Sequence, residues 1–157
     1  MILAVVSDTH RRKSQIGKVL KKIKNADVLI HLGDNAEDVD EMGLYFSNPI
    51  YSVRGNCDFS LRAPSERIET IGGKRILITH GHKYSVKYNL MNLKYRALEV
   101  GADIVLYGHT HIANIECNNG IWFINPGSAS ISRGMFNSIA FIEINNGVIT
   151  PSIVDVE

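Results

Sequence analysis

The sequence predicts an α/β fold in which two mixed β-sheets pack face to face and helices cover their outer faces. Near the N-terminus, apolar strand-like runs alternate with helix-like segments, which is typical of a parallel sheet flanked by helices. In the middle and towards the C-terminus, pairs of apolar runs are separated by Gly-Gly or Asn-Gly, and such turns join antiparallel strands. A further strand and helix lie between these hairpins, so both patterns are expected in one fold.

The N-terminal part predicts a repeated order of strand, loop and helix. Met1 to Ser7 is an apolar run rich in Ile and Val, which favours a buried strand. Ser14 is a plausible helix N-cap, and apolar residues recur at helical spacing from Ile16 to Ile23 with lysines on the opposite face. The order continues with a strand, a short helix and a strand at Asp27 to His31, Asp38 to Phe46 and Ile50 to Val53.

The rest of the chain is richer in hairpins. Ile68 to Ile71 and Arg75 to Thr79 flank the turn Gly72-Gly73, and a helix is expected from Val86 to Val100 with Gly101 as its C-cap. The remaining expected strands are Ile104 to Tyr107, Ile112 to Cys117, Ile121 to Asn125, Ile139 to Ile144 and Val148 to Val154. Because no linker or low-complexity tract interrupts this order, we expect one domain over residues 1–157.

Composition narrows the classes of protein to consider. The chain has 157 residues, of which 45% are hydrophobic, and this is enough for one substantial core. Seventeen basic residues face sixteen acidic ones without a basic stripe, so there is no strong signal for a nucleic-acid partner. The apolar run Ile2 to Val6 is too short for a secretory segment or a membrane span of roughly 20 residues. We therefore expect a cytoplasmic protein with no membrane partner.

The two cysteines do not suggest a metal or disulfide framework. Cys57 and Cys117 lie far apart and form no C-x-x-C pair. The six histidines are more informative, because they cluster with Asp, Asn and Gly instead of scattering along helices.

Short polar clusters follow five of the predicted strands. They are Asp8-Thr9-His10, Gly33-Asp34, Gly55-Asn56, His80-Gly81 and Gly108-His109-Thr110-His111. The carboxyl ends of strands in an open α/β sheet lie at one edge, so residues distant in the sequence can meet there. Glycines allow sharp turns and a close approach of the backbone. One pocket could therefore gather seven side chains: Asp8, His10, Asp34, Asn56, His80, His109 and His111.

The mixture of ligand types predicts a transition-metal site. Carboxylate, imidazole and amide groups without thiolate suit Mn, Fe, Co, Ni or Zn better than an all-oxygen Mg or Ca site. Seven ligands are too many for one ion, so we expect two divalent ions. Two ions about 3.5–4 Å apart need a bridging carboxylate and hold a hydroxide between them near neutral pH. Asp34 is the candidate bridge.

The order and spacing of the five clusters resemble the calcineurin-like metallophosphoesterase superfamily over nearly the whole chain. The short length and the loop Asn125-Pro126-Gly127-Ser128 are similar to the small single-domain prokaryotic phosphodiesterases of that superfamily, which are related to a eukaryotic retromer subunit. The resemblance implies a four-layer α/β/β/α sandwich and a metal-dependent phosphodiesterase.

The resemblance also implies roles for individual residues. One metal would be held by Asp8, His10, Asp34 and His111, and the second by Asp34, Asn56, His80 and His109. The bridging hydroxide would attack phosphorus in line while the metals neutralise charge in the transition state. The implied catalytic set is Asp34, Asn56, Cys57 and Asp58, and the residues expected to contact a small phosphodiester substrate are Asn56, His82 and Arg133.

One position departs from the family pattern. Many relatives have His directly after the Asn of the third cluster, where it assists the leaving group, whereas this chain has Cys57. A thiol is a weaker hydrogen-bond donor than imidazolium. We therefore expect either substrates with good leaving groups or a different proton donor such as His82.

His31 is expected to be a hydrogen-bonded structural histidine.

Other functions remain open at this point. The fold could serve as a protein-interaction scaffold that keeps a metal pocket, as in the retromer relative, although this chain retains Asp34 and Asn56. A phosphomonoesterase or a nuclease could use the same ions, and the near-zero net charge weakens the nuclease reading. Association of identical copies is also left open.

Overall fold

The computed structural model describes residues 1–157 and contains two five-stranded sheets. The first sheet consists, in spatial order, of β10 (Val148–Asp155), β9 (Ser138–Asn145), β1 (Ile2–Val6), β2 (Val28–His31) and β3 (Ile50–Ser52). The second consists of β4 (Glu66–Ile71), β5 (Lys74–Thr79), β6 (Ile104–Leu106), β8 (Ile121–Pro126) and β7 (Ala113–Asn118).

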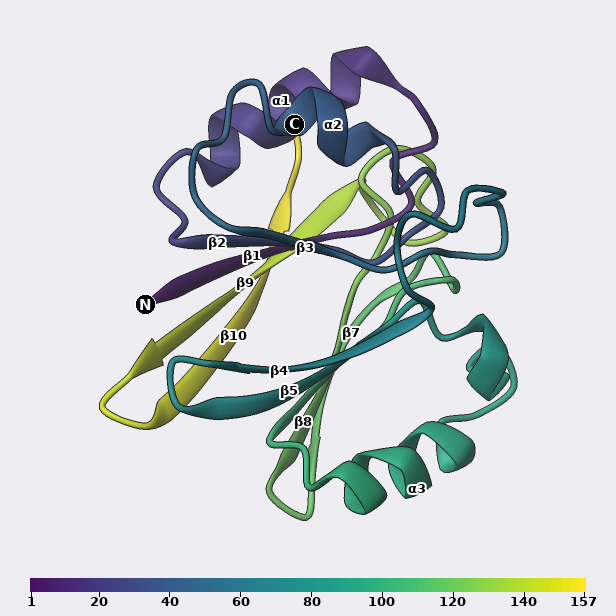
Figure 1. The fold of residues 1–157 in the computed structure, drawn as a ribbon, viewed down its shortest axis with the longest axis vertical. Helices are drawn as coiled ribbons and strands as arrows, with labels where there is room; N and C mark the ends of the chain where they lie inside the picture. The colour runs from purple at the N-terminus through teal and green to yellow at the C-terminus, as the bar shows by residue number, and fades with distance from the viewer.

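Each sheet has a parallel part and an antiparallel part. In the first sheet β1, β2 and β3 run parallel, and β9 and β10 are antiparallel to their neighbours. In the second sheet β5, β6 and β8 run parallel, and β4 and β7 pair antiparallel at the two edges. The loops after the parallel strands lie at the right of Figure 1, whereas the hairpin turns of β4–β5 and β9–β10 lie at the left. This placement brings the predicted polar clusters to one edge.

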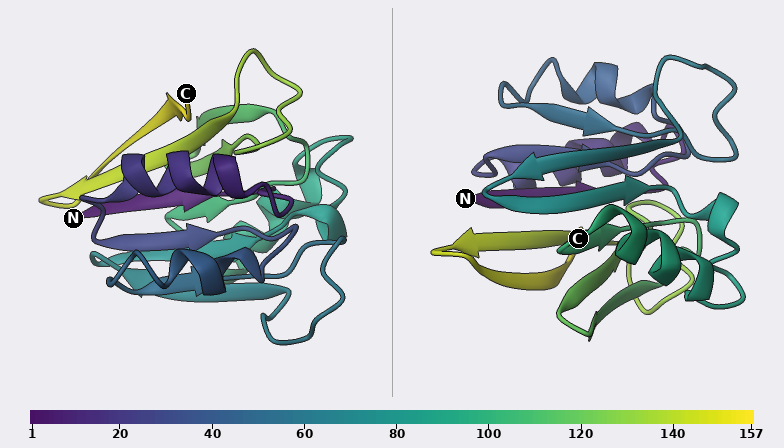
Figure 2. Two further views of the ribbon diagram at one scale, coloured as in Figure 1. Left: turned by 90° about the horizontal axis from the view of Figure 1, so that it is seen from above. Right: turned by 60° about the horizontal axis from the view of Figure 1, so that its bottom comes forward.

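Helices cover the outer face of each sheet. Helices α1 (Lys13–Ile23) and α2 (Asp38–Met42) lie over the first sheet, and α3 (Met91–Val100) lies over the second (Figure 1). Figure 2 shows the same stacking from two further sides. The expected four-layer α/β/β/α sandwich with two mixed sheets is therefore confirmed.

The core consists of one layer between the sheets and one under each set of helices. Along β1, Leu3 and Val5 face the second sheet, and Ala4 and Val6 face the helices. All four side chains are fully buried, because a strand covered on both sides alternates between two apolar environments. This explains why the sequence of β1 is a continuous apolar run.

Two helix starts differ from the sequence-based expectation. Helix α1 begins at Lys13, so Ser14 lies inside it and no side chain caps its N-terminus. The helix expected from Val86 begins only at Met91, whose N–H donates to the Asn89 side chain at 2.9 Å.

Residues before α3 form a short 3-10 helix, η1 (His82–Tyr84), followed by a turn in which Ser85 has a left-handed backbone. Val86 is buried in the same cluster as Leu93 and Ala97, so it completes the apolar pattern of the helix without belonging to it. In addition, α2 ends at Met42, and Phe46 reaches its buried position through a turn. None of the helices combines the length and the apolar character needed to cross a bilayer.

Candidate metal centre

The polar clusters at the carboxyl ends of β1, β2 and β6 converge on one point. One ligand atom from each of four residues lies within 4.8 Å of the others, and these residues are Asp8, His10, Asp34 and His111. Asp8 and Asp34 are buried, and the two histidines are partly exposed. The first half of the predicted ligand set, called the buried half below, is therefore assembled by the fold itself.

The backbone turns sharply at these ligands. Five of the seven predicted ligands have a positive φ: Asp8 (56°), His10 (48°), Asp34 (55°), His109 (68°) and His111 (60°). Asp and His tolerate this left-handed region better than most residues, but each such position still costs about 1–3 kcal/mol. Residues of this kind concentrate at functional sites when the surrounding structure holds them in place. The turns point consecutive side chains towards a common centre.

The loops that carry Asp34 and Asn56 touch each other directly. A Cβ atom on Gly55 would overlap Asp34 Oδ1, and a Cβ on Gly33 would overlap the backbone nitrogen of Gly55. Gly33 also has a φ of +97°, which a side chain rarely permits. The two glycines are therefore needed for the close approach of the loops.

Unpaired acceptor atoms in the buried half fit a metal ion. The Nδ1 atom of His111 donates to the carbonyl of Ile131 at 2.9 Å, so the neutral ring leaves Nε2 without a proton. This Nε2 atom lies 3.0 Å from Asp8 Oδ1, and the buried atoms Asp8 Oδ1 and His10 Nε2 have no hydrogen-bond partner. Acceptor atoms this close repel each other unless a cation or proton lies between them. The donor set suits a divalent ion.

The electrostatics of Asp8 and His111 follow from the same contact. Burial opposes ionisation of Asp8, but the 3.0 Å contact with the His111 ring, the charge of His80 and the hydrogen bond from Ser7 outweigh it and lower the pKa to about 2. The carboxylate in turn raises the pKa of His111 above its ordinary value, although burial works against this. Asp8 is therefore a carboxylate at neutral pH.

The other predicted ligands form what we call the open half of the centre. His80 donates through Nδ1 to the carbonyl of Leu32 at 2.8 Å, and its Nε2 lies 3.1 Å from Asn56 Oδ1 and 3.5 Å from Asp34 Oδ1. The His80 ring also lies 5.1 Å from that of His109, measured between centroids. Burial and the charges of His80 and Lys87 lower the pKa of His109 to about 4, so this imidazole is neutral and available as a ligand.

The carboxylate of Asp58 connects the two loops of the open half. Oδ2 accepts the backbone N–H groups of Asp34 and Gly55, and Oδ1 accepts those of Asn35 and Ala36, at distances of 2.7–2.9 Å. Both oxygens are thus occupied within the protein. We infer that Asp58, expected above among the catalytic residues, positions Asp34 instead of contacting substrate.

The remaining predicted residues lie around the centre. The backbone N–H of Cys57 donates to Asp34 Oδ1 at 2.9 Å, and burial together with the Asp34 carboxylate raises the pKa of its exposed thiol. The ring of His82 lies 5.4 Å from His80 and 6.1 Å from His109, and its Nδ1 is buried without a partner. Arg133 is exposed, and its backbone N–H donates to the carbonyl of His111 at 2.9 Å. Substrate contact by His82 and Arg133 stays a prediction.

Sequence reasoning missed several residues that support the ligands. The hydroxyls of Ser128 and Ser130 both donate to the backbone carbonyl of Asp8 at 2.9 Å, and Ser7 donates to its carboxylate. In the sequence, the loop containing Ser128 contributes to the family resemblance but predicts no contact with Asp8. Its link to Asp8 spans 120 residues, so no local signal could have revealed it.

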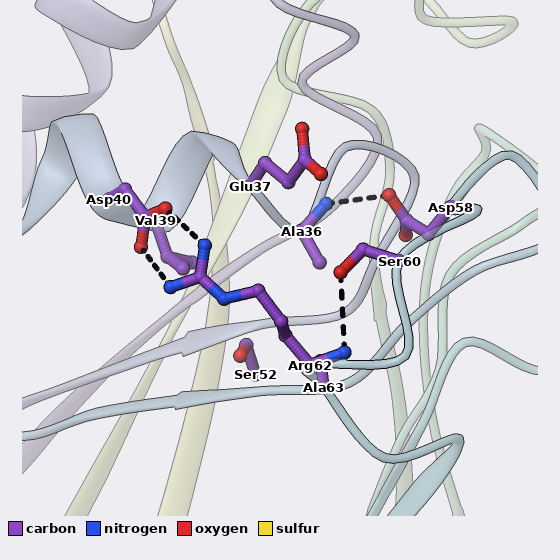
Figure 3. A pocket seen from close by; sticks show the side chains of 9 residues that line it. All are labelled: Ala36, Glu37, Val39, Asp40, Ser52, Asp58, Ser60, Arg62 and Ala63. Carbon is purple, nitrogen blue, oxygen red and sulfur yellow. Dashed lines mark hydrogen bonds and ion pairs between the residues drawn. The ribbon is translucent and has the colours of Figure 1, made fainter.

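A separate cavity of about 150 Å³ lies next to the open half (Figure 3). Asp58 and Ala36 form its boundary towards the metal centre, and Arg62 extends across it to form an ion pair with Asp40. None of the seven predicted ligands lines this cavity. No pattern in the sequence predicts this cavity.

Two mixed sheets with carboxylates and imidazoles gathered at their common edge define a metal-binding α/β sandwich. The chain belongs to the calcineurin-like phosphoesterase superfamily, because residues 1–147 match the model of that superfamily domain. The resemblance stated from the five clusters is therefore confirmed.

Two curated relatives agree with this assignment. The probable metallophosphoesterase YsnB of Bacillus subtilis (strain 168) is 35% identical over 157 residues, which cover 99% of this chain and 91% of the relative. The phosphodiesterase YfcE of Escherichia coli (strain K12) is 31% identical over 113 residues, which cover 66% of this chain and 56% of the relative. The chain is thus a member of a family of metallophosphoesterases.

Two solved structures have the same fold. A conserved uncharacterized protein of Streptococcus pneumoniae TIGR4, described as a predicted phosphoesterase, has a TM-score of 0.85 and 29% identity, with 99% of this chain and 89% of that chain covered. Vps29 of Entamoeba histolytica, solved in complex with Zn²⁺, has a TM-score of 0.78 and 22% identity, with both chains fully covered. The second likeness concerns the fold alone.

Proposed function

We propose that this protein is a phosphodiesterase that depends on two divalent metal ions. The observation that carries the proposal is the close approach of ligand atoms from Asp8, His10, Asp34 and His111, among which the buried atoms Asp8 Oδ1 and His10 Nε2 have no hydrogen-bond partner. Such a group is unfavourable in a folded protein unless a cation compensates it. Membership of a metallophosphoesterase family supports a hydrolytic function for the cation site.

The geometry supports Asp34 as a ligand shared by the two ions. The first ion would be held by Asp8, His10, Asp34 and His111, and the second by Asp34, Asn56, His80 and His109. Two divalent ions bound there would supply a hydroxide nucleophile near neutral pH and neutralise charge on the phosphoryl oxygens. Mn, Fe, Co, Ni and Zn suit these ligands.

The chain's own residues orient the ligands and the substrate. The Cys57 N–H fixes one oxygen of Asp34, and the carbonyls of Leu32 and Ile131 fix the tautomers of His80 and His111. Partners of this kind hold ligand atoms in the geometry that a metal requires. The exposed Asn56 amide, His82 and Arg133 would contact a small phosphodiester at the open side of the centre.

Cys57 should give the leaving group little assistance. Because the pKa of its thiol is raised, the group stays protonated at neutral pH and donates only weak hydrogen bonds. Hydrolysis should therefore favour substrates whose leaving group needs no proton, such as aryl phosphodiesters. The name of the relative YfcE supports a phosphodiester substrate over a monoester.

A scaffold role is the second candidate, since Vps29 has the same fold. The complete set of seven ligand residues in this chain favours catalysis over a scaffold role alone. Cytoplasmic location and association of identical copies stay predictions.

The proposal is tested by hydrolysis of bis-p-nitrophenyl phosphate with metal-free protein to which Mn, Co, Ni or Zn is added back. Activity should return with added metal, and Asp34→Ala should lower it on the order of 10³-fold, because several kcal/mol of transition-state stabilisation is lost. Asp40→Ala is the matched control, since this exposed carboxylate pairs only with Arg62. If activity is absent with every metal, or if Asp34→Ala is as active as the control, the proposal is wrong.

A further inference from the structure

A buried histidine outside the ligand set lies between two ligand-bearing loops. His31 is the last residue of β2, the strand between β1 and β3, and its side chain is fully buried. Its ring is enclosed by residues of the loops that follow β1 and β2. The proposed metal centre assigns no role to this residue.

The hydrogen bonds of His31 determine which ring nitrogen carries the proton. The backbone N–H of Gly33 donates to Nδ1 at 3.2 Å, so Nδ1 has no proton of its own. The proton is therefore on Nε2, which lies 3.1 Å from the hydroxyl oxygen of Thr9 and donates to it. Burial lowers the pKa of His31, although the carboxylates of Asp38, Asp8 and Asp58 oppose this shift. A neutral ring is consistent with the geometry.

The chain of hydrogen bonds continues from Thr9 to α2. Having accepted from His31, the Thr9 hydroxyl donates to Asp38 Oδ2, and the same oxygen accepts the backbone N–H of Arg11 at 3.0 Å. Each bond has a defined direction, from Gly33 through His31 and Thr9 to Asp38. The four residues linked by these hydrogen bonds, Gly33, His31, Thr9 and Asp38, are all buried.

The chain of bonds joins segments that carry ligands of the first ion. Thr9 lies between Asp8 and His10, and Gly33 directly precedes Asp34. The left-handed backbone at Asp8 and Asp34 is unfavourable and needs external support to persist. His31 contacts both loops at the residues next to these turns.

We propose that His31 is a positioning residue that fixes the separation of Asp8 and Asp34 and thereby sets the affinity of the first ion. The inference rests on the proposed metal centre. His31 contacts neither substrate nor metal, and it acts through Thr9 and Gly33. Residues of this kind contribute about 10–100-fold to metal affinity in other proteins.

Three substitutions separate the two contacts of His31. His31→Leu removes both, His31→Asn retains an acceptor near Gly33, and His31→Gln retains an N–H donor that reaches Thr9. Leu29→Ala is the control, since Leu29 is fully buried on the same strand and makes none of these hydrogen bonds. Leu29→Ala destabilises the fold by loss of packing alone.

The readouts are calorimetric titration with Co²⁺ and the visible absorption of bound Co²⁺, which reports ligand geometry. His31→Leu should weaken the tighter Co²⁺ site about 10–100-fold and change its spectrum. His31→Gln should recover part of the affinity, and Leu29→Ala should bind Co²⁺ like the wild type. A wild-type spectrum and affinity in His31→Leu would overturn the inference while leaving the proposed function intact.

A second measurement does not depend on metal. The ¹⁵N chemical shifts of the His31 ring in the metal-free protein should show the proton on Nε2 at neutral pH. A proton on Nδ1 would overturn the inference, because the bond from Gly33 could not form. Absence of any Co²⁺ binding in the wild type would instead overturn the proposed function, and this inference with it.

Discussion

The buried and open halves of the proposed metal centre differ in how completely the protein assembles them. In the buried half, four ligand atoms lie within 4.8 Å, and Asp8 and Asp34 are buried. In the open half, Asn56 is exposed, and the Nε2 atom of His80 lies 3.1 Å from the Asn56 side chain. The two halves share only Asp34.

The difference follows from what lies behind each half. The loop of Asp8 is held by the hydroxyls of Ser128 and Ser130 and by the hydrogen bonds that start at His31. The loop of Asn56 lies at the surface and is anchored mainly through Asp58. Because preformed ligands lose less conformational freedom on binding, we expect the buried half to bind its ion more tightly.

The largest expected effects come from removing one ligand from each half. His111→Ala should abolish the tighter site, and Asn56→Ala should weaken only the second site, while each lowers hydrolysis on the order of 10³-fold through loss of one ion. Metal titration distinguishes the two variants, because Asn56→Ala should retain the tightly bound ion and His111→Ala should not. If both variants lose both ions equally, the two halves do not differ as described.

A smaller effect is expected from changing Asp58, which holds the loops of the open half in place. Asp58→Asn replaces one acceptor oxygen by an NH₂ group that faces backbone donors, so the free energy of unfolding should fall by about 3 kcal/mol. Asp40→Asn, which removes an exposed ion pair, should change it by less than about 1 kcal/mol. Urea titrations of the two variants measure both values. Equal stabilities would show that the Asp58 contacts contribute little.

The support of the buried half has a pH signature. The pKa of His31 is lowered in the folded protein from an ordinary value of 6.5, so the unfolded chain binds a proton more readily. The free energy of unfolding of the metal-free protein should therefore decrease as pH falls below about 6.5 towards the pKa of the folded state. His31→Gln should reduce this slope, and Leu29→Ala should retain it. An unchanged slope in His31→Gln would contradict burial of a neutral ring.

The smallest effect is expected at Cys57. Cys57→Ala should hydrolyse bis-p-nitrophenyl phosphate within about twofold of wild type, because an aryl leaving group needs no proton and the backbone N–H to Asp34 remains. Cys117→Ala, at an exposed cysteine on β7, is the matched control. Loss of activity specific to Cys57→Ala would assign the thiol a direct role.

Much of the fold was predictable because it follows from local patterns. The continuous apolar runs of β1 and β2 predict strands buried on both faces, and the turn Gly72-Gly73 predicts the β4–β5 hairpin. The start of α3 was not predictable, since Val86 has the spacing of a helical core residue but reaches that core from a turn. Periodicity reports which side chains are buried and leaves open the backbone conformation that carries them.

The sequence by itself determined the kinds of ligand and the strand ends that carry them. Carboxylates and imidazoles after apolar runs are local features, and parallel strands bring such ends to one edge. Only the tertiary structure decided that the halves of the centre are unequal, that Asp58 binds four backbone N–H groups, and that His31 connects the loops of Asp8 and Asp34. Apart from the bond between Gly55 and Asp58, these contacts join residues 22 or more positions apart or depend on the orientation of a ring, and neither property is encoded by local spacing.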